Sequence, residues 1–341
     1  MLKNMKLATK IIAGFGLVIT FLIIVGITGF LSLNKTIKQI DVMTKQLEIV
    51  KNTNQAKSLS QVGQADSLRY IIYENEDYLK ASQENNLNAI DEINKAKELM
   101  QSIENKNNAD IVANSAKSYI NANEEYADLF KKKQTAGTIR AEAANQVTNQ
   151  IDALLTRSKQ LLQNSSSDSS KESAEKLLLA QDAKNAFNQV CIWAYKFQLT
   201  LTPEQEEAAA REWISGIQLT KKILEQCHSE MSDSESKQNA NLAAQALNTY
   251  LSQVDIFRQI NNEQREIQLK KLKPAADSLM ADTEKVLTGV YTFIDTTKEQ
   301  ANSQISLANF MIKAISISAI IIGVLAAIII TRSITDRKSV V

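Results

Sequence analysis

Apolar side chains recur every three or four residues along most of this chain, which is the spacing of one face of an α-helix. The stripes run through Ile37, Ile40, Thr44, Leu47 and Val50, through Tyr250, Val254, Phe257 and Ile260, and through Leu279, Val286, Val290 and Phe293. Such stripes usually form the core of a helical bundle. No stretch alternates apolar and polar residues for long enough to predict a β-strand, so we expect an all-α fold.

Two uncharged runs predict membrane-spanning helices. Residues 11–34 are about 24 residues long and residues 314–331 about 18, close to the length that crosses a bilayer. Basic residues lie before the first run and after the second, namely Lys3, Lys6, Lys10, Arg332, Arg337 and Lys338. The positive-inside rule then puts residues 1–10 and 332–341 in the cytoplasm and 35–312 outside it, with spans at 11–34 and 313–331. A cleaved signal peptide is the alternative for the first run, but that run is longer than a signal peptide requires.

Polar clusters between the stripes predict the ends of the helices. They lie at residues 81–83, 105–108, 164–170 and 229–236, and Thr202-Pro203-Glu204 has the pattern of a helix start. We therefore expect helices at about 35–81, 84–104, 108–163, 171–201, 203–229 and 234–312.

The lengths of these helices predict two stacked four-helix bundles. A membrane-proximal module would use the first two helices, the start of the third and the end of the last. A distal module would use the remaining segments, because short connections favour antiparallel neighbours. Pro274 interrupts the last helix, and a proline there removes a backbone hydrogen bond and bends the helix. It is a passive kink, the junction between the modules or the floor of a pocket.

Composition narrows the possible functions. The chain has 9 Gly and 2 Pro in 341 residues, which favours long helices with few turns. One His and two Cys leave no His/Cys zinc site and little for His-based catalysis, so we expect no metal, no cofactor and no enzyme activity. The net charge of +1 gives no basic surface for nucleic acid.

Residues 4–18, NMKLATKIIAGFGLV, resemble the amino terminus of bacterial methyl-accepting chemotaxis receptors, and residues 330–335, ITRSIT, resemble the exit of their second span into a HAMP relay. The part between the spans is similar to their helical bimodular sensor domains. The resemblance implies a transmembrane chemoreceptor that senses small chemoeffectors, often organic acids. Asp336-Arg337-Lys338 departs from the proline expected there, and the sequence given ends at Val341. We therefore expect a receptor fragment or truncated product, whose kinase-coupling partners act only through the missing signalling region.

Arginine is the side chain best suited to bind a carboxylate, because its planar guanidinium donates two parallel hydrogen bonds. Arg69 and Tyr73 share one helix face. Counting axial rise places Tyr119 and Arg265 near the same level. These four residues are our predicted proximal ligand site. In the alternative, Arg69 only pairs with a nearby acidic residue on a hydrated surface.

The distal module offers a weaker second site. Its candidates are Arg140, Trp193, Arg211 and Trp213, with the two tryptophans on either side of the turn at Pro203. In the alternative, the aromatic residues only fill the base of the bundle. Cys191 and Cys227 would differ in height by roughly 20 Å, too far apart for a disulfide, so we expect two free thiols.

The leading interpretation is a two-pass sensor in the inner (plasma) membrane, in contact with membrane lipid. A ligand would favour one packing of the last helix and shift the second span by about 1–2 Å. Coiled-coil-like spacing in the first and last helices favours a homodimer. The alternatives are the sensor portion of a transmembrane histidine kinase and a ligand-free, membrane-tethered helical spacer.

Overall fold

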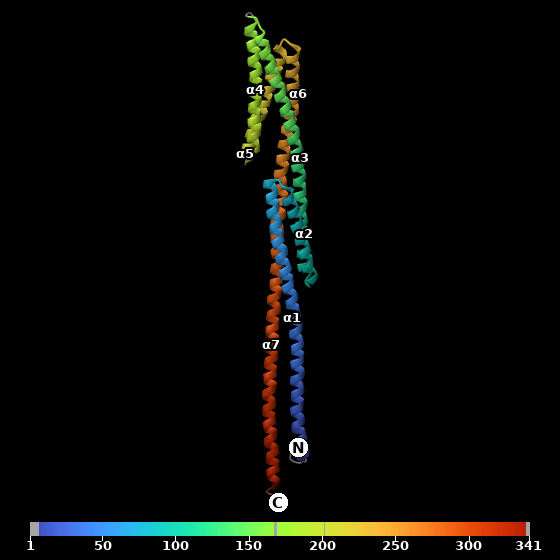
Figure 1. Cartoon of the computed structure of the whole chain (residues 1–341). Coiled ribbons are helices and arrows are strands. Elements are labelled where there is room, and N and C mark those ends of the chain that lie inside the picture. The colour runs from blue at the N-terminus through green and yellow to red at the C-terminus, as the bar shows by residue number, and fades with distance from the viewer. Residues whose placement is uncertain (1–6, 167–168, 201, 339–341) are drawn as a thin grey trace. The chain divides into compact units, whose positions relative to one another are not determined.

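The computed structural model describes residues 7–166, 169–200 and 202–338 (Figure 1). Over these residues the chain forms helices and no β-strand, which confirms the predicted all-α class. The helices are α1 (Leu7–Tyr73), α2 (Glu76–Leu99), α3 (Ile103–Gln163), α4 (Ser170–Gln198), α5 (Pro203–Glu230), α6 (Ser234–Ile267), the π-helical turn η2 (Gln268–Leu272) and α7 (Lys273–Lys338). Lys3, Lys6 and the start of the amino-terminal motif lie outside the described residues.

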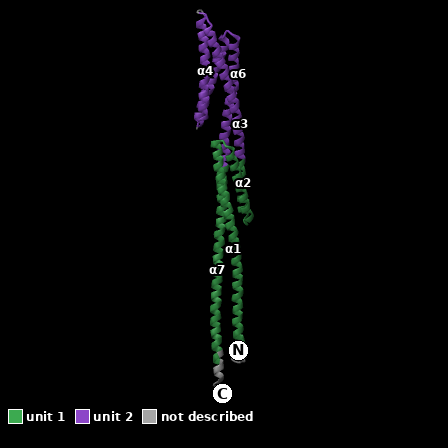
Figure 2. Ribbon diagram, viewed as in Figure 1, with its two compact units in different colours: residues 1–120, 275–341 green, residues 121–274 purple. Residues whose placement is uncertain are grey.

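The helices form two compact units (Figure 2). Unit 1 comprises Met1–Ile120 and Ala275–Val341, and unit 2 comprises Asn121–Pro274. Unit 1 therefore contains α1, α2, the start of α3 and α7, whereas unit 2 contains the rest of α3 together with α4, α5, α6 and η2. Each unit thus consists of the segments that the sequence assigns to one four-helix module.

The predicted break at residues 81–83 is wrong, because α1 ends earlier, at Tyr73. Glu74 takes a left-handed backbone conformation with φ of 57°. The side chain of Asn75 then caps α2 by accepting a hydrogen bond from the backbone N–H of Asp77 (2.9 Å). Ser82 is buried inside α2, where its hydroxyl donates to the carbonyl of Gly63 on α1 (2.7 Å). Ser82 therefore makes a helix–helix contact, and residues 81–83 do not form a turn.

The second predicted break, at residues 105–108, also lies too late in the chain. The turn falls between Leu99 and Ile103, and the hydroxyl of Ser102 accepts from the backbone N–H of Asn105 (3.4 Å). The asparagines at 105–108 misled the prediction, because asparagine occurs both in turns and at polar positions of long helices.

The predicted start of α5 is confirmed, because the Thr202 side chain accepts a hydrogen bond from the N–H of Gln205 and Pro203 occupies the first turn.

The two cores differ in polarity. Unit 2 has a large apolar cluster that includes Leu154, Phe187, Val190, Trp213, Leu224 and Leu247. The apolar cluster of unit 1 is smaller and contains Ile49, Ile93, Leu279, Val286 and Val290. On α1 the buried positions are mostly small or polar, namely Gln46, Asn52, Thr53, Ala56, Ser60, Gly63, Asp66 and Ser67. Hydrophobic packing therefore holds α1 less tightly than it holds the helices of unit 2.

The first predicted stripe, from Ile37 to Val50, is not a core face. Ile37, Ile40 and Leu47 are exposed, with 55%, 58% and 60% of their surface accessible. The core face of α1 instead passes through Gln46 and Ile49. The prediction fails because, in the described part of the chain, no other helix packs over the side of α1 that carries these residues.

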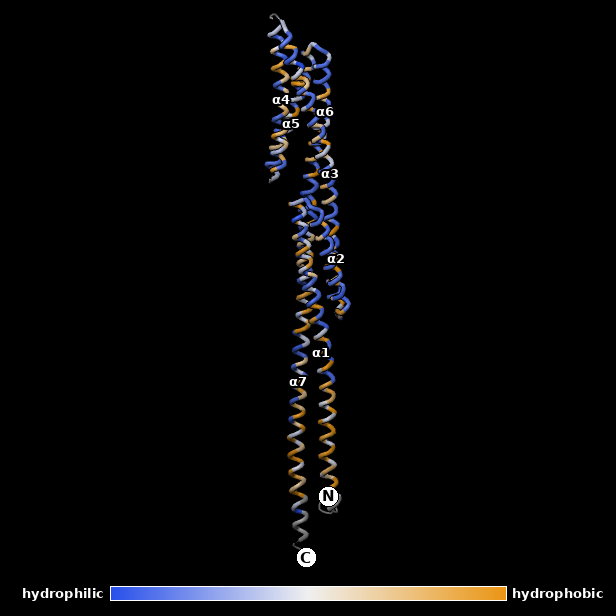
Figure 3. Tube along the Cα trace, viewed as in Figure 1, coloured by the Kyte–Doolittle hydropathy of each residue, from blue (hydrophilic) through white to orange (hydrophobic). Residues whose placement is uncertain are grey.

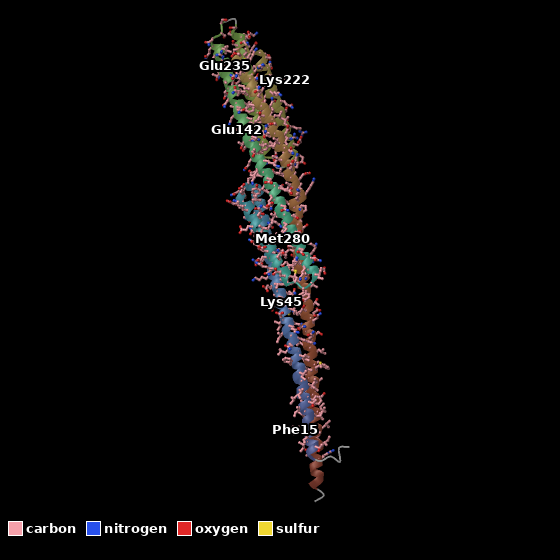
Figure 4. All side chains as sticks on the ribbon, turned by 90° about the vertical axis from the view of Figure 1, so that its right-hand side faces the viewer. Phe15, Lys45, Glu142, Lys222, Glu235 and Met280 are labelled. Atoms are coloured by element: carbon pink, nitrogen blue, oxygen red, sulfur yellow. The ribbon has the colours of Figure 1, made fainter. Side chains whose placement is uncertain are left out.

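Two helices, α1 and α7, contain segments that are long and apolar enough to cross a membrane. Figure 3 shows these segments as the orange ends of both helices. Phe15, labelled in Figure 4, projects outward from this part of α1. Gly14, Phe15 and Val18 line one groove together with Gly323 and Ala326 of α7, so the two apolar segments run side by side within unit 1.

Candidate functional site

An arginine lies among aromatic rings inside unit 2. Arg140 comes from α3, Trp213 from α5 and Phe257 from α6. The guanidinium carbon of Arg140 lies 4.7 Å from the ring centroid of Phe257 and 5.4 Å from that of Trp213. Both distances fall within the range in which a cation is attracted to an aromatic face. Three helices of unit 2 therefore converge on one cation.

Trp213 is the central aromatic residue of this cluster and is fully buried. Its indole Nε1 donates a hydrogen bond to the hydroxyl oxygen of Tyr250 (3.2 Å). The ring of Phe197, from α4, packs against it with centroids 5.2 Å apart. Tyr250 meets the indole edge to face, at 6.0 Å and 80°, a favoured arrangement for aromatic pairs. We call Arg140, Phe197, Trp213, Tyr250 and Phe257 the aromatic cluster.

Arg140 has no anionic partner among the described residues. Its Nη1 atom is buried and makes no hydrogen bond, and no ion pair involving Arg140 occurs in the described part of the chain. The cation–π contacts attract the charge but supply no hydrogen-bond acceptor. Because an arginine remains charged and a buried donor without an acceptor is destabilising, this nitrogen lacks a partner that it would be expected to have.

The surroundings of Arg140 also perturb two other titratable groups. Burial raises the pKa of Tyr250 to about 12, although the hydrogen bond from Trp213 and the positive charge of Arg140 act in the opposite direction. Partial desolvation of the sulfur raises the pKa of the Cys191 thiol, although the residue as a whole is exposed, and the Arg140 charge again opposes the effect. The positive field of Arg140 therefore reaches side chains on both α4 and α6.

The raised pKa of Tyr250 predicts that unit 2 loses stability at high pH. The phenol ionises near pH 10 in the unfolded chain and near 12 in the folded one, so its contribution is complete below pH 10 and is lost as the pH rises to 12. The full loss is about 2–3 kcal/mol. Urea titrations at pH 9 and pH 11.5 would measure it. The Tyr250→Phe variant should lack this component, and an equal pH dependence in that variant would contradict the prediction.

Two of the predicted distal residues lie apart from the aromatic cluster. Arg211 is exposed on α5. Trp193 is half-buried, and the Nζ atom of Lys196 lies 4.2 Å from its ring centroid. The residue of α4 that packs on Trp213 is Phe197, one turn after Trp193. Of the four predicted distal residues, the structure therefore brings together Arg140 and Trp213.

In unit 1, Arg69 is already paired. Its Nη1 donates to a carboxylate oxygen of Asp66 (2.8 Å), and its side chain is 55% exposed whereas that of Asp66 is 8% exposed. The second Asp66 oxygen accepts from the side-chain amide of Asn85 on α2 (3.2 Å). The guanidinium carbon of Arg69 also lies 6.0 Å from the ring centroid of Tyr78. Arg69 thus closes a polar cluster between α1 and α2.

The other proximal candidates are spread over different parts of the fold. Tyr73 is exposed at the end of α1, with its ring centroid 6.0 Å from that of Tyr78. Tyr119 is buried in unit 1. Arg265 belongs to unit 2, where it forms an ion pair with Glu206 of α5. Assigning Arg265 to the proximal module was therefore wrong, because axial counting ignored which helices actually pack beside it.

The cysteines and acidic residues form no further reactive centre in the described residues. Cys191 is exposed on α4 and Cys227 is buried on α5, and both are free thiols. Burial raises the pKa of Cys227 to about 12, which disfavours the thiolate at neutral pH. No group of three His, Cys, Asp or Glu side chains in the described ranges is placed to hold a metal ion.

Three members of the aromatic cluster were not predicted as site residues, namely Phe197 of α4 and, on α6, Tyr250 and Phe257. Tyr250 and Phe257 were expected as ordinary core positions, and both are indeed buried. Their seven-residue spacing puts them on the same face of α6. An arginine predicted inside the same module, as Arg140 was, is the only sequence signal that could have singled them out.

Comparisons with known proteins give the family context. The family described as a four helix bundle sensory module for signal transduction matches residues 4–178, more than half of the chain. This stretch covers α1, α2, α3 and the start of α4. No curated protein matches the chain in sequence.

Proposed function

The chain belongs to the family of four-helix bundle sensory modules for signal transduction, and we propose that it is the sensory and anchoring part of a transmembrane chemoreceptor. This family consists of sensors and not of enzymes. Two helices that can cross a membrane support a two-pass topology. The basic residues beside both apolar segments support an orientation with residues 35–312 outside the cytoplasm.

The ligand of this receptor is a small organic acid, and the unpartnered guanidinium of Arg140 is the observation that carries this proposal. A carboxylate beside Arg140 would supply the acceptor that Nη1 lacks and would neutralise a partly buried charge. Trp213 and Phe257 flank the guanidinium and suit the apolar part of a small acid. Arg69, Tyr73 and Tyr119 remain a second candidate site, although Arg69 already pairs with Asp66.

Signal relay follows from the chain path. α6, η2 and α7 follow one another without a loop, and α7 contains the second apolar segment. A ligand that binds one packing of these helices more tightly than another shifts the equilibrium by that difference in affinity. We expect the second span to move by about 1–2 Å, the usual size of helix shifts in switching proteins. A cytoplasmic signalling module that couples to a kinase would receive this movement.

The receptor acts as a homodimer in contact with membrane lipid. Ile37, Ile40 and Leu47 form an exposed apolar face on α1, with the three- and seven-residue spacing of a coiled-coil seam. A second copy of the same helix is a partner that would cover this face. Such a dimer would also join the two α1 helices just outside the membrane.

Replacing Arg140 tests the ligand proposal. The variant Arg140→Met keeps an apolar stem among the rings but removes the charge, so we expect affinity for the organic acid to fall about 10- to 100-fold. Isothermal titration calorimetry on the full chain in nanodiscs, with a panel of mono- and dicarboxylates, would measure this. Arg211→Met is the matched control, because Arg211 is an exposed arginine of the same unit and its loss should leave affinity unchanged.

The other outcomes are equally informative. Loss of binding in Arg69→Ala together with unchanged affinity in Arg140→Met would move the site to unit 1. Because Arg140 has no acidic partner, Arg140→Met should also leave the stability of unit 2 unchanged or higher. If no carboxylate in the panel binds the parent protein, the ligand proposal is wrong and a ligand-free helical spacer becomes the better interpretation.

A further inference from the structure

The long helix that ends in the second apolar segment is interrupted by a single π-helical turn. η2 covers Gln268–Leu272, and the N–H of Lys273 bonds to the carbonyl of Gln268, five residues earlier. Pro274 follows directly. A proline has no N–H to donate, and its ring collides with the carbonyl four residues earlier, which here belongs to Lys270. The wider π turn is compatible with this proline, and isolated π turns are frequent at functional sites.

The burial pattern shows that η2 contains an extra residue. On α6 the buried positions Ile260, Gln264 and Ile267 follow one another at steps of four and three. An α-helix would bury Lys270 or Lys271 next, yet both are exposed. The next buried residue is Leu272, five positions after Ile267. The π turn therefore absorbs one residue that a regular α-helix could not fit.

Beyond η2 the regular spacing returns. Within unit 1 the buried face of α7 passes through Leu279, Val286 and Val290, and steps of seven and four fit an α-helix. Leu272 lies seven residues before Leu279 and therefore fits the same α-helical spacing. If the same residues formed a regular α-helix instead of a π turn, the residues after Ile267 would be out of phase by about 100°, the rotation per residue of an α-helix. The π turn thus keeps Leu272 on the same helix face as Ile267.

The polar contacts of this turn include one long hydrogen bond, from the side-chain amide of Gln268 to the hydroxyl of Tyr126 on α3 (3.4 Å), and two ion pairs. Lys271 pairs with Glu125 of α3, and Lys270 with Glu266 of α6. Both pairs are half-exposed or more, and exposed ion pairs contribute little to stability. Ile267, Lys270 and Lys271 also border a groove of about 400 Å³ against α3. The turn therefore has space beside it in which to rearrange.

We propose that η2 is a movable joint, whose extra residue lets the helix that follows it change its axial position. The role of this joint in signalling rests on the proposed receptor function. Moving a π turn along a helix advances the passed residues by one position, which is about 1.5 Å of axial rise. That step matches the size of helix shifts in switching proteins. The joint lies at the end of unit 2, directly before the first residue that α7 contributes to unit 1.

Removing the extra residue tests the joint directly. Deleting Leu269, an exposed residue, and combining the deletion with Pro274→Ala should produce a continuous α-helix that keeps Ile267 and Leu272 on one face. Hydrogen exchange on the full chain in nanodiscs should show amides 268–273 exchanging at least tenfold faster than the buried turns of α6 in the parent. The deletion variant should lose this difference while keeping its helical circular dichroism.

Two controls separate the extra residue from other causes. Pro274→Ala alone keeps the extra residue and should keep the fast exchange. Deleting the exposed residue Asp255 together with Pro274→Ala rotates Phe257 and Ile260 away from the helix face of the buried residues that precede the deletion. This variant should therefore have a lower melting temperature of unit 2. Uniformly slow exchange over residues 260–280 in the parent would overturn the proposal, as would fast exchange that persists in the Leu269 deletion.

A signalling measurement completes the test. The full chain would be fused to a cytoplasmic kinase-controlling module and exposed to the carboxylate that binds most tightly in calorimetry. We expect the Leu269 deletion to bind within twofold of the parent but to need at least tenfold more ligand for the same kinase response. An unchanged response would overturn the signalling role. If the parent binds no carboxylate, the receptor proposal fails, whereas the exchange experiment still decides whether η2 is a joint.

Discussion

Replacing Trp213 with alanine should lower the free energy of unfolding of unit 2 by about 3–5 kcal/mol. Trp213 is completely buried, so truncation removes a large apolar side chain and leaves a cavity. It also removes the hydrogen bond to the Tyr250 hydroxyl (3.2 Å) and a ring against which Phe197 packs. Urea unfolding of the full chain in detergent micelles, followed by circular dichroism, would measure the loss.

Trp193→Ala is the matched control for this prediction. Trp193 is half-buried and its ring lies against Lys196, so its truncation should cost less than about 1.5 kcal/mol. The difference between the two variants isolates burial from the general effect of losing a tryptophan. Equal shifts in the unfolding midpoint would show that Trp213 is not the centre of the unit 2 core.

The Gly63→Ala variant should lower the free energy of unfolding of unit 1 by about 1–3 kcal/mol. A Cβ atom at this position would overlap Nδ2 of Asn86 and lie 3.1 Å from the backbone carbonyl oxygen of Ser82. Asn86 is itself buried and donates to that same carbonyl (2.8 Å), so it has little room to move. The added methyl group would force α1 and α2 apart and weaken the Ser82–Gly63 hydrogen bond.

Gly137→Ala provides the control for this substitution. Its Cβ atom would meet only the ring of Phe257, at an ordinary contact distance of 3.5 Å. In a helix interior alanine is favoured over glycine by about 0.5–1 kcal/mol, so this variant should be neutral or more stable. Thermal unfolding in nanodiscs would compare the two. A stable Gly63→Ala protein would mean that α1 and α2 do not pack as closely as the structure indicates.

The contrast between the two cores bears on how a receptor could use them. Unit 2 packs large aromatic and aliphatic side chains around Trp213, and dense packing of this kind fixes one arrangement. On α1 of unit 1 the buried face carries Asn52, Ser60, Gly63 and Asp66. Small and polar contacts allow helices to shift with a smaller loss of apolar burial. Unit 2 is thus suited to hold a ligand and unit 1 to move.

The sequence by itself determined the features that depend on local spacing. Helical periodicity, the two apolar runs and the cap at Thr202 each involve residues within a few turns of one another, and the helices they predict are present. The helix ends near residues 81 and 105 were predicted wrongly, because the same polar residues serve in turns and in helix–helix contacts. Ser82 shows the second use, since its partner Gly63 lies on another helix.

Only the tertiary structure decided which side chains meet across helices. It surrounded Arg140 with Trp213 and Phe257 and paired Arg69 with Asp66. It also left Ile37 and Ile40 exposed. Spacing along one helix defines a face, but the identity of the facing helix depends on how all helices of a unit pack together. The π turn at Gln268–Leu272 has the same origin, because the extra residue is recognisable only once the buried positions on both sides of it are known.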